Sequence, residues 1–108
     1  MNKYGLHAKL MATKGNGNRL ASILIDASKL VSMAQGCHLY LVSKDIINED
    51  SIWVTEVWDS KEDHDNSLKV EGVRDLISMA MPLLDGQPKK GQELKVLGGA
   101  GIWDNKKI

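Results

Sequence analysis

Residues 36–76 read GCHLYLVSKDIINEDSIWVTEVWDSKEDHDNSLKVEGVRDL and carry most of the information on the fold. Within them, residues 37–44 and 51–58 have the alternating pattern that is typical of strands. The polar segment 45–50 between them is short enough to form a turn. The sequence therefore predicts an antiparallel hairpin.

The pairing of this hairpin decides which side chains share a face. If Lys44 pairs with Ser51, both faces are largely apolar, because each strand presents alternate side chains to opposite sides. A sheet that is apolar on both sides needs a cover on both. We expect the chain's helices to cover one face and a second copy of the protein to cover the other. The faces predicted by this pairing are Cys37, Leu39, Leu41, Ile52, Val54, Glu56 and Trp58 on one side, and His38, Tyr40, Val42, Trp53, Thr55 and Val57 on the other.

The segments before the hairpin predict one strand and one helix. Residues 3–13 alternate in character, as expected for a strand, and the turn KGNGN follows them. Apolar residues then recur at helical spacing over residues 20–34. Asn16 or Asn18 is suited to cap this helix, and Gly36 is suited to end it.

The segments after the hairpin predict a second helix and a last strand. Ser60, followed three residues later by Asp63, resembles a capping box, so a helix should begin just after Ser60. Gly72 interrupts or bends that helix, and an apolar stripe resumes over residues 73–84. Residues 92–97 are predicted to form the last strand, at an edge of the sheet.

The order of these elements predicts an α+β fold. Strand, helix, strand, strand, helix, strand is the split ferredoxin-like βαββαβ arrangement, with both helices on one face of a four-stranded sheet. Because this leaves the other face bare, we expect a homodimer in which two sheets pack together as a dimeric α+β barrel. Residues 1–108 form a single domain in this interpretation, with a core over about 3–99 and a C-terminal tail or arm over 100–108.

The composition excludes several classes of partner and location. Fourteen basic residues balance fourteen acidic ones, so no electrostatic field attracts nucleic acid or an anionic membrane. The apolar stretches are too short to span a membrane, and the N-terminus lacks the apolar core of a signal peptide, so a cytoplasmic protein is expected. The single cysteine, Cys37, fits a reducing compartment and is expected to be a core residue.

Three short stretches resemble a known family. GCHLYLVS (36–43), WVTEVW (53–58) and DSKEDHDNSL (59–68) are similar to the antibiotic biosynthesis monooxygenase (ABM) domain, and the resemblance runs over about residues 3–99. It implies a dimeric ferredoxin-like protein, similar to quinol monooxygenases. Characterised members include quinol and anthrone-type monooxygenases that use no cofactor, haem-degrading enzymes and an isomerase of a small signalling sugar.

The resemblance also implies a pocket between the sheet and the helices, where a small flat phenolic or quinol-type substrate meets O2 without metal or flavin. A deprotonated electron-rich ring can pass an electron to O2 directly. The protein then has to supply only a base, an apolar cavity and donors that stabilise the anion. We therefore expect an oxidoreductase with no cofactor.

His64 is the first candidate for the base. It should lie in the first turn of its helix, on the face of Leu68, with its ring toward the interior. The structural alternative is a half-buried histidine bonded to a backbone carbonyl or to Asp65. Three histidines without an HxH or HxxxH pair, and one cysteine, predict no metal site.

Glu56 is a carboxylate among apolar neighbours, which is costly unless it is paired or hydrogen-bonded. A structural ion pair across the sheet or across the dimer, for example with Arg19, Lys9 or Arg74, is the leading interpretation, and acid–base chemistry is the alternative. Aromatic and polar side chains nearby could contact a substrate, although each could equally serve the core or the interface. These candidates are His7, Tyr40, Trp53, Trp58 and Ser67.

Three other functions remain open at this stage. A haem-degrading enzyme of this family would carry a tryptophan about where Ser67 stands and a histidine on the last helix, where this chain has Ser78. An isomerase of a small metabolite would use similar acid–base groups. A dimeric ligand-binding protein without catalysis would use the same fold.

Overall fold

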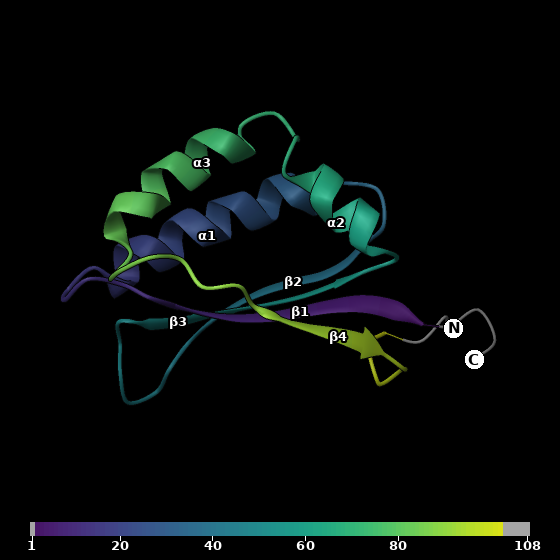
Figure 1. The fold of residues 1–108 in the computed structure, drawn as a ribbon, viewed down its shortest axis with the longest axis horizontal. Helices are drawn as coiled ribbons and strands as arrows, with labels where there is room; N and C mark the ends of the chain where they lie inside the picture. The colour runs from purple at the N-terminus through teal and green to yellow at the C-terminus, as the bar shows by residue number, and fades with distance from the viewer. Residues whose placement is uncertain (1, 103–108) are drawn as a thin grey trace.

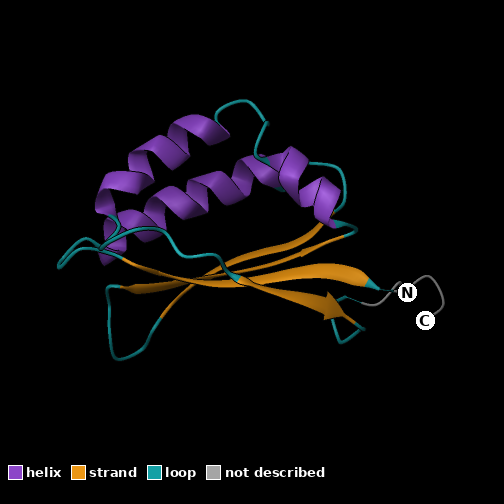
Figure 2. Ribbon diagram, viewed as in Figure 1, coloured by secondary structure: helices purple, strands orange, loops and turns teal. Residues whose placement is uncertain are grey.

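The computed structural model describes residues 2–102, which form a four-stranded antiparallel sheet with helices on one face. Figures 1 and 2 show the two layers: all the helices lie on the same side of the sheet. The strand order is β2-β3-β1-β4, which confirms the ferredoxin-like α+β fold and the edge position of the last strand. Residues 103–108, most of the predicted tail or arm, lie outside the described residues. The elements are β1 (Lys3–Met11), α1 (Gly17–Val31), β2 (Cys37–Lys44), β3 (Ser51–Trp58), α2 (Lys61–Ser67), α3 (Val73–Ala80), the 3-10 turn η1 (Met81–Leu83) and β4 (Gln92–Val96).

The hairpin register differs by one residue from the predicted one. Lys44 pairs with Ile52 instead of Ser51. The turn itself causes the shift, because the Asp45 amide donates to the Ser51 carbonyl at 3.0 Å, and the Ser51 amide donates to the Asn48 carbonyl at 3.0 Å. A register slip of one exchanges the faces of one strand relative to the other. The helix-facing side of the hairpin therefore carries Tyr40, Val42, Ile52, Val54, Glu56 and Trp58, and the opposite side carries Leu39, Leu41, Trp53, Thr55 and Val57.

The core between the sheet and the helices has two clusters. Leu20 of α1 and Ile52 of β3 are fully buried in one of them, together with Ala80 at the end of α3. Trp58 is fully buried in the other, against Val31 of α1. Each of the large side chains contributes about 1.5–3 kcal/mol by leaving water. The region between the two clusters is where the candidate site lies.

The start of α1 is held by a residue from the hairpin turn. The Asp50 carboxylate accepts from the Gly17 amide at 2.9 Å and from the Gly15 amide at 3.1 Å. Asn16 occupies the capping position, but its side chain donates to the Thr13 hydroxyl at 2.7 Å and makes no cap, so the prediction of an asparagine cap was wrong.

The second helical region begins as predicted and is split in two. The Ser60 hydroxyl accepts from the Asp63 amide at 3.1 Å, which confirms Ser60 as a cap. Gly72 adopts φ 91°, a left-handed conformation that glycine takes without strain, and it separates α2 from α3. After the break, α2 lies over one end of the sheet and α3 runs alongside α1 (Figure 1).

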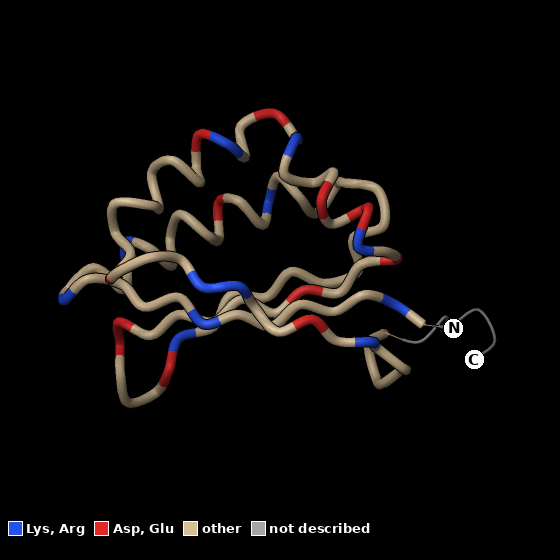
Figure 3. Tube along the Cα trace, in the orientation of Figure 1, with Lys and Arg blue, Asp and Glu red and all other residues tan. Residues whose placement is uncertain are grey.

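Within residues 2–102, no helix lies on the face of the sheet opposite α1, α2 and α3 (Figure 2). Leu41 of β2 and Leu94 of β4 lie on this face and are 49% and 46% exposed. Charged residues of both signs are spread over both layers (Figure 3). Within residues 2–102, no helix has the length and apolar character needed to cross a membrane.

Candidate active site

A cavity of about 170 Å³ lies between the helices and the sheet. Its walls are almost wholly apolar and come from α1, α3 and the loop that follows η1. Four polar side chains also line it: Tyr40 of β2, Glu56 of β3, and His64 and Ser67 of α2. Four of the predicted site residues are thus brought together by the fold.

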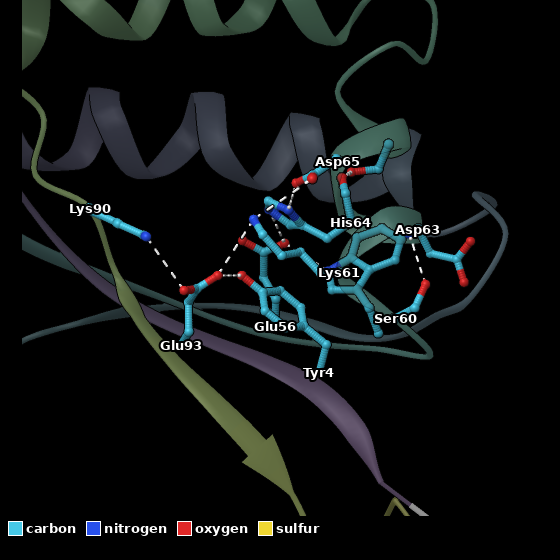
Figure 4. A network of polar contacts seen from close by, with 11 residues as sticks. Tyr4, Glu56, Ser60, Lys61, Asp63, His64, Asp65, Lys90 and Glu93 are labelled. Carbon is cyan, nitrogen blue, oxygen red and sulfur yellow. Dashed lines mark hydrogen bonds and ion pairs between the residues drawn. The ribbon is translucent and has the colours of Figure 1, made fainter.

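His64 lies between two carboxylates, one buried and one at the surface (Figure 4). Its Nε2 is 3.8 Å from Glu56 Oε1, and its Nδ1 is 2.9 Å from Asp65 Oδ1. The imidazole is only 15% exposed. The helix turn that carries it is fixed at its start by the Ser60 cap, and the Ser67 hydroxyl donates to the His64 carbonyl at 2.6 Å.

These contacts assign the proton on the imidazole. The hydrogen bond from His64 holds the pKa of the exposed Asp65 carboxyl below its usual range, so Asp65 is ionised at neutral pH and can only accept. Nδ1 therefore carries hydrogen and donates to Asp65. Nε2 is then the ring nitrogen that faces Glu56 and the cavity.

Glu56 is 8% exposed and accepts from the Trp58 indole nitrogen at 2.9 Å. Burial raises the pKa of its carboxyl, and the Trp58 hydrogen bond and His64 oppose that rise only in part. Within residues 2–102, none of the predicted partners Arg19, Lys9 and Arg74 meets Glu56, and the groups that do are Trp58 and His64. A buried carboxyl beside a histidine can share one proton with it.

Tyr40 lies directly opposite Glu56 on the neighbouring strand. Burial raises the pKa of its hydroxyl, and the Glu56 carboxylate adds to the rise, so the hydroxyl stays protonated at neutral pH. Within residues 2–102 no hydrogen bond occupies it. Tyr40 therefore offers a donor to a molecule in the cavity.

A chain of polar contacts leads from His64 to the surface (Figure 4). Lys61 is 3.7 Å from Asp65 and 3.5 Å from Glu93 of β4. Glu93 also accepts from the Tyr4 hydroxyl at 2.9 Å, and burial together with this carboxylate raises the pKa of Tyr4 to about 12. Sequence reasoning did not select Tyr4, although its place opposite Trp58 follows once the strands are paired.

The other candidates lie outside the cavity. Trp58 is buried beside His64, with the two rings edge to face at 6.0 Å, and it supports the site without lining the cavity. His7 and Trp53 lie on the face opposite the helices, with their rings stacked and the ring centroids 4.8 Å apart. His7 Nδ1 is 2.9 Å from the Thr55 hydroxyl. Among residues 2–102, no group of three or more His, Cys, Asp and Glu side chains is arranged to hold a metal ion.

Comparison with known proteins agrees with this architecture. The family model for antibiotic biosynthesis monooxygenases matches residues 4–78. The chain belongs to the antibiotic biosynthesis monooxygenase family. An ABM protein from Chloroflexus aurantiacus, provisionally assigned as such a monooxygenase, is 39% identical over 94% of this chain and 99% of its own, with a TM-score of 0.82.

More distant ABM structures share the fold. A provisionally assigned antibiotic biosynthesis monooxygenase from Caulobacter crescentus is 16% identical, with a TM-score of 0.79 over 90% of this chain and 92% of its own. Another from Nitrosomonas europaea is 8% identical, with a TM-score of 0.81 over 88% and 90% of the two chains. A search of the curated proteins finds no match to the sequence.

Proposed function

We propose that this ABM protein oxidises a small phenolic or quinol-type aromatic with O2 and uses no cofactor. The observation that carries the proposal is the position of the His64 imidazole in an apolar cavity, with Nδ1 2.9 Å from Asp65 Oδ1 and Nε2 3.8 Å from Glu56 Oε1. For a simple phenol, the balanced reaction converts one phenol and one O2 into one benzoquinone and one water. The substrate supplies all four electrons, so no external reductant is needed.

His64 is the base in this reaction. Its Nε2 accepts the phenolic proton, and the resulting imidazolium is stabilised by Asp65 on one side and by the Glu56 carboxyl on the other. The phenolate then transfers one electron to O2, and the two radicals combine at a ring carbon. The His64 imidazolium returns its proton to the peroxide anion, which gives a hydroperoxide. Loss of water, formed from the hydroperoxide OH and the hydrogen on the same ring carbon, then yields the quinone.

The rest of the cavity favours the same step. The Tyr40 hydroxyl donates to the developing phenolate, which lowers the barrier to deprotonation. The apolar walls exclude water, which strengthens these interactions and keeps superoxide from escaping before it recombines. The size of the cavity also favours a small ring over haem, a macrocycle of four pyrrole rings.

The test is O2 consumption by metal-stripped protein with a panel of phenols, catechols and hydroquinones. His64→Ala should lose at least a hundredfold in kcat, as expected for removal of a general base. His38→Ala is the matched control, since His38 pairs with Asp59 at the surface, 2.6 Å away, and does not line the cavity. Uptake that survives in His64→Ala would reject His64 as the base, and no uptake with any compound would reject the reaction.

We infer that a second copy of the chain covers the bare face of the sheet. Leu41 and Leu94 are half-exposed there, Leu41 lies near Trp53 and Leu39, and residues 2–102 place no helix on this side. Burying such a face is a common route to a twofold dimer. In that dimer the His7 and Trp53 pair would lie at the interface.

A further inference from the structure

We infer that the cavity ligand is a single-ring phenol or catechol, with its hydroxyls on one edge of the ring and a short alkyl group on the other. This inference rests on the proposed function and narrows it, because a para-hydroquinone or a three-ring anthrone would fit the same chemistry but not this cavity. It follows from where the polar side chains lie, from what lines the rest of the cavity, and from its volume.

The polar groups of the cavity gather at one end. Tyr40 and Glu56 are direct cross-strand partners, and His64 Nε2 is 3.8 Å from the Glu56 carboxylate. The Ser67 hydroxyl donates a hydrogen bond to the His64 carbonyl at 2.6 Å. A hydroxyl oxygen placed to one side of the His64–Glu56 pair can reach both groups, and a neighbouring hydroxyl can reach Tyr40. Two adjacent hydroxyls of one ring would match this set.

The other end of the cavity is apolar. Leu10 lines it and pairs with Ile52, which is four residues from Glu56 along β3, or roughly 13 Å at the rise of a strand. Leu20, Ala80 and Leu84 close this end. The half-exposed part of the lining is apolar as well, since it consists of Leu68, Ile77 and Met81. No side chain that lines the cavity beyond the polar end can pair with a second, distant hydroxyl.

The volume limits the ligand to one ring. The cavity measures about 170 Å³, close to the roughly 150 Å³ of an engineered apolar cavity that binds benzene. A benzene ring with two or three added carbons matches this volume, and we expect three fused rings to extend past the half-exposed part of the lining. The alkyl group would occupy the space near Leu10 and Leu84.

A para-hydroquinone would have to bury its second hydroxyl at the apolar end. An unpaired buried hydroxyl weakens binding by about tenfold or more, because it gives up its bonds to water without replacement. 4-Propylcatechol and propylhydroquinone have the same formula and nearly the same apolar surface. Their difference in affinity therefore reports on where the hydroxyls fit.

The experiment is anaerobic titration calorimetry with four compounds: 4-propylcatechol, propylhydroquinone, 4-propylphenol and anthrone. Without O2 it measures binding and not turnover. We expect the catechol to bind at least tenfold more tightly than the hydroquinone, and anthrone not to bind. Leu84→Gln adds a polar group at the apolar end. It should reduce the difference in affinity between the two isomers, because the hydroquinone should bind more tightly. Ile25→Gln, at a residue of α1 that is 45% exposed and does not line the cavity, is the matched control and should leave both affinities unchanged.

Each outcome bears on one claim. Equal affinities for the two isomers would overturn the placement of the hydroxyls, tight binding of anthrone would overturn the size limit, and binding of no compound would overturn the ligand class. If Leu84→Gln fails to fold, as judged by its melting curve, the wild-type comparison of isomers decides alone. Selective binding of the catechol without O2 uptake would keep this inference and reject the proposed reaction.

Discussion

The Trp58 indole nitrogen lies 2.9 Å from Glu56 Oε1, on the helix-facing side of β3. Two residues that share a strand face are joined by this hydrogen bond, and it fixes the buried carboxylate beneath His64. The Trp58 ring is itself immobilised, because it is fully buried among α1 and α3 side chains. The position of Glu56 relative to the base is therefore set by the core.

We predict that Glu56→Gln stabilises the fold most at alkaline pH. Burial raises the pKa of the Glu56 carboxyl, so the folded protein binds this proton more tightly than the unfolded chain. The stability that this gives is present below the usual pKa of a glutamate and is lost as pH rises through the raised pKa. Glutamine keeps an oxygen to accept from Trp58 and carries no charge, so it escapes that loss.

The measurement is the melting temperature of both proteins from about pH 4 to pH 8. The advantage of Glu56→Gln should grow with pH by a few degrees, given roughly 4–8 °C for each kcal/mol in a domain of this size. Glu49→Gln, an exposed change in the hairpin turn, is the control and should track the wild type. An advantage that shrinks with rising pH would contradict the prediction.

Asp65 is predicted to act as a positioning residue for the base. Asp65→Ala should lower kcat about tenfold while KM changes little, since the carboxylate holds the His64 tautomer but does not line the cavity. Asp65→Asn keeps an acceptor for Nδ1 and should recover part of the rate. Steady-state O2 uptake separates the two constants, and Asp59→Asn, next to His38, should leave both unchanged. A rise in KM alone would instead indicate substrate binding.

The fold could be predicted because each element has a strong local pattern. The alternation of β1, the helical spacing of α1 and the cap at Ser60 are all properties of neighbouring residues. The hairpin register was missed because it depends on the bonds between Asp45 and Ser51 inside the turn. Those bonds are decided by turn geometry, and the apolar character of both faces gave no penalty for either register.

The site was predictable to the extent that its residues follow local rules. His64 faces inward because it shares a helix face with Leu68, four residues on, and Glu56 stood out as a carboxylate among apolar neighbours. The contact between them joins β3 to α2 and follows only from tertiary packing. The same holds for Asp50, whose role at α1 depends on a turn 33 residues away from Gly17.

Leu41→Lys should convert a dimer to monomers in sedimentation experiments. Leu41 is half-exposed on the bare face of the sheet, so a single chain can accommodate lysine, but burial of that charge against a second copy would be unfavourable. Ile25→Lys is the matched control, because Ile25 is 45% exposed on α1, in the helix layer. If Leu41→Lys sediments with the same dimer mass as the wild type, the bare face is not the dimer interface.

Asp50→Ala should destabilise the fold by about 1 kcal/mol, the usual cost of losing a helix cap. Its carboxylate accepts from the amides of Gly15 and Gly17, and no other side chain in residues 2–102 bonds to those amides. The melting temperature should fall by roughly 4–8 °C. Glu49→Ala, one residue away and exposed, removes a charge without removing a cap and should melt within about 2 °C of the wild type. Equal losses in the two variants would mean that charge in the turn, and not the cap, stabilises the start of α1.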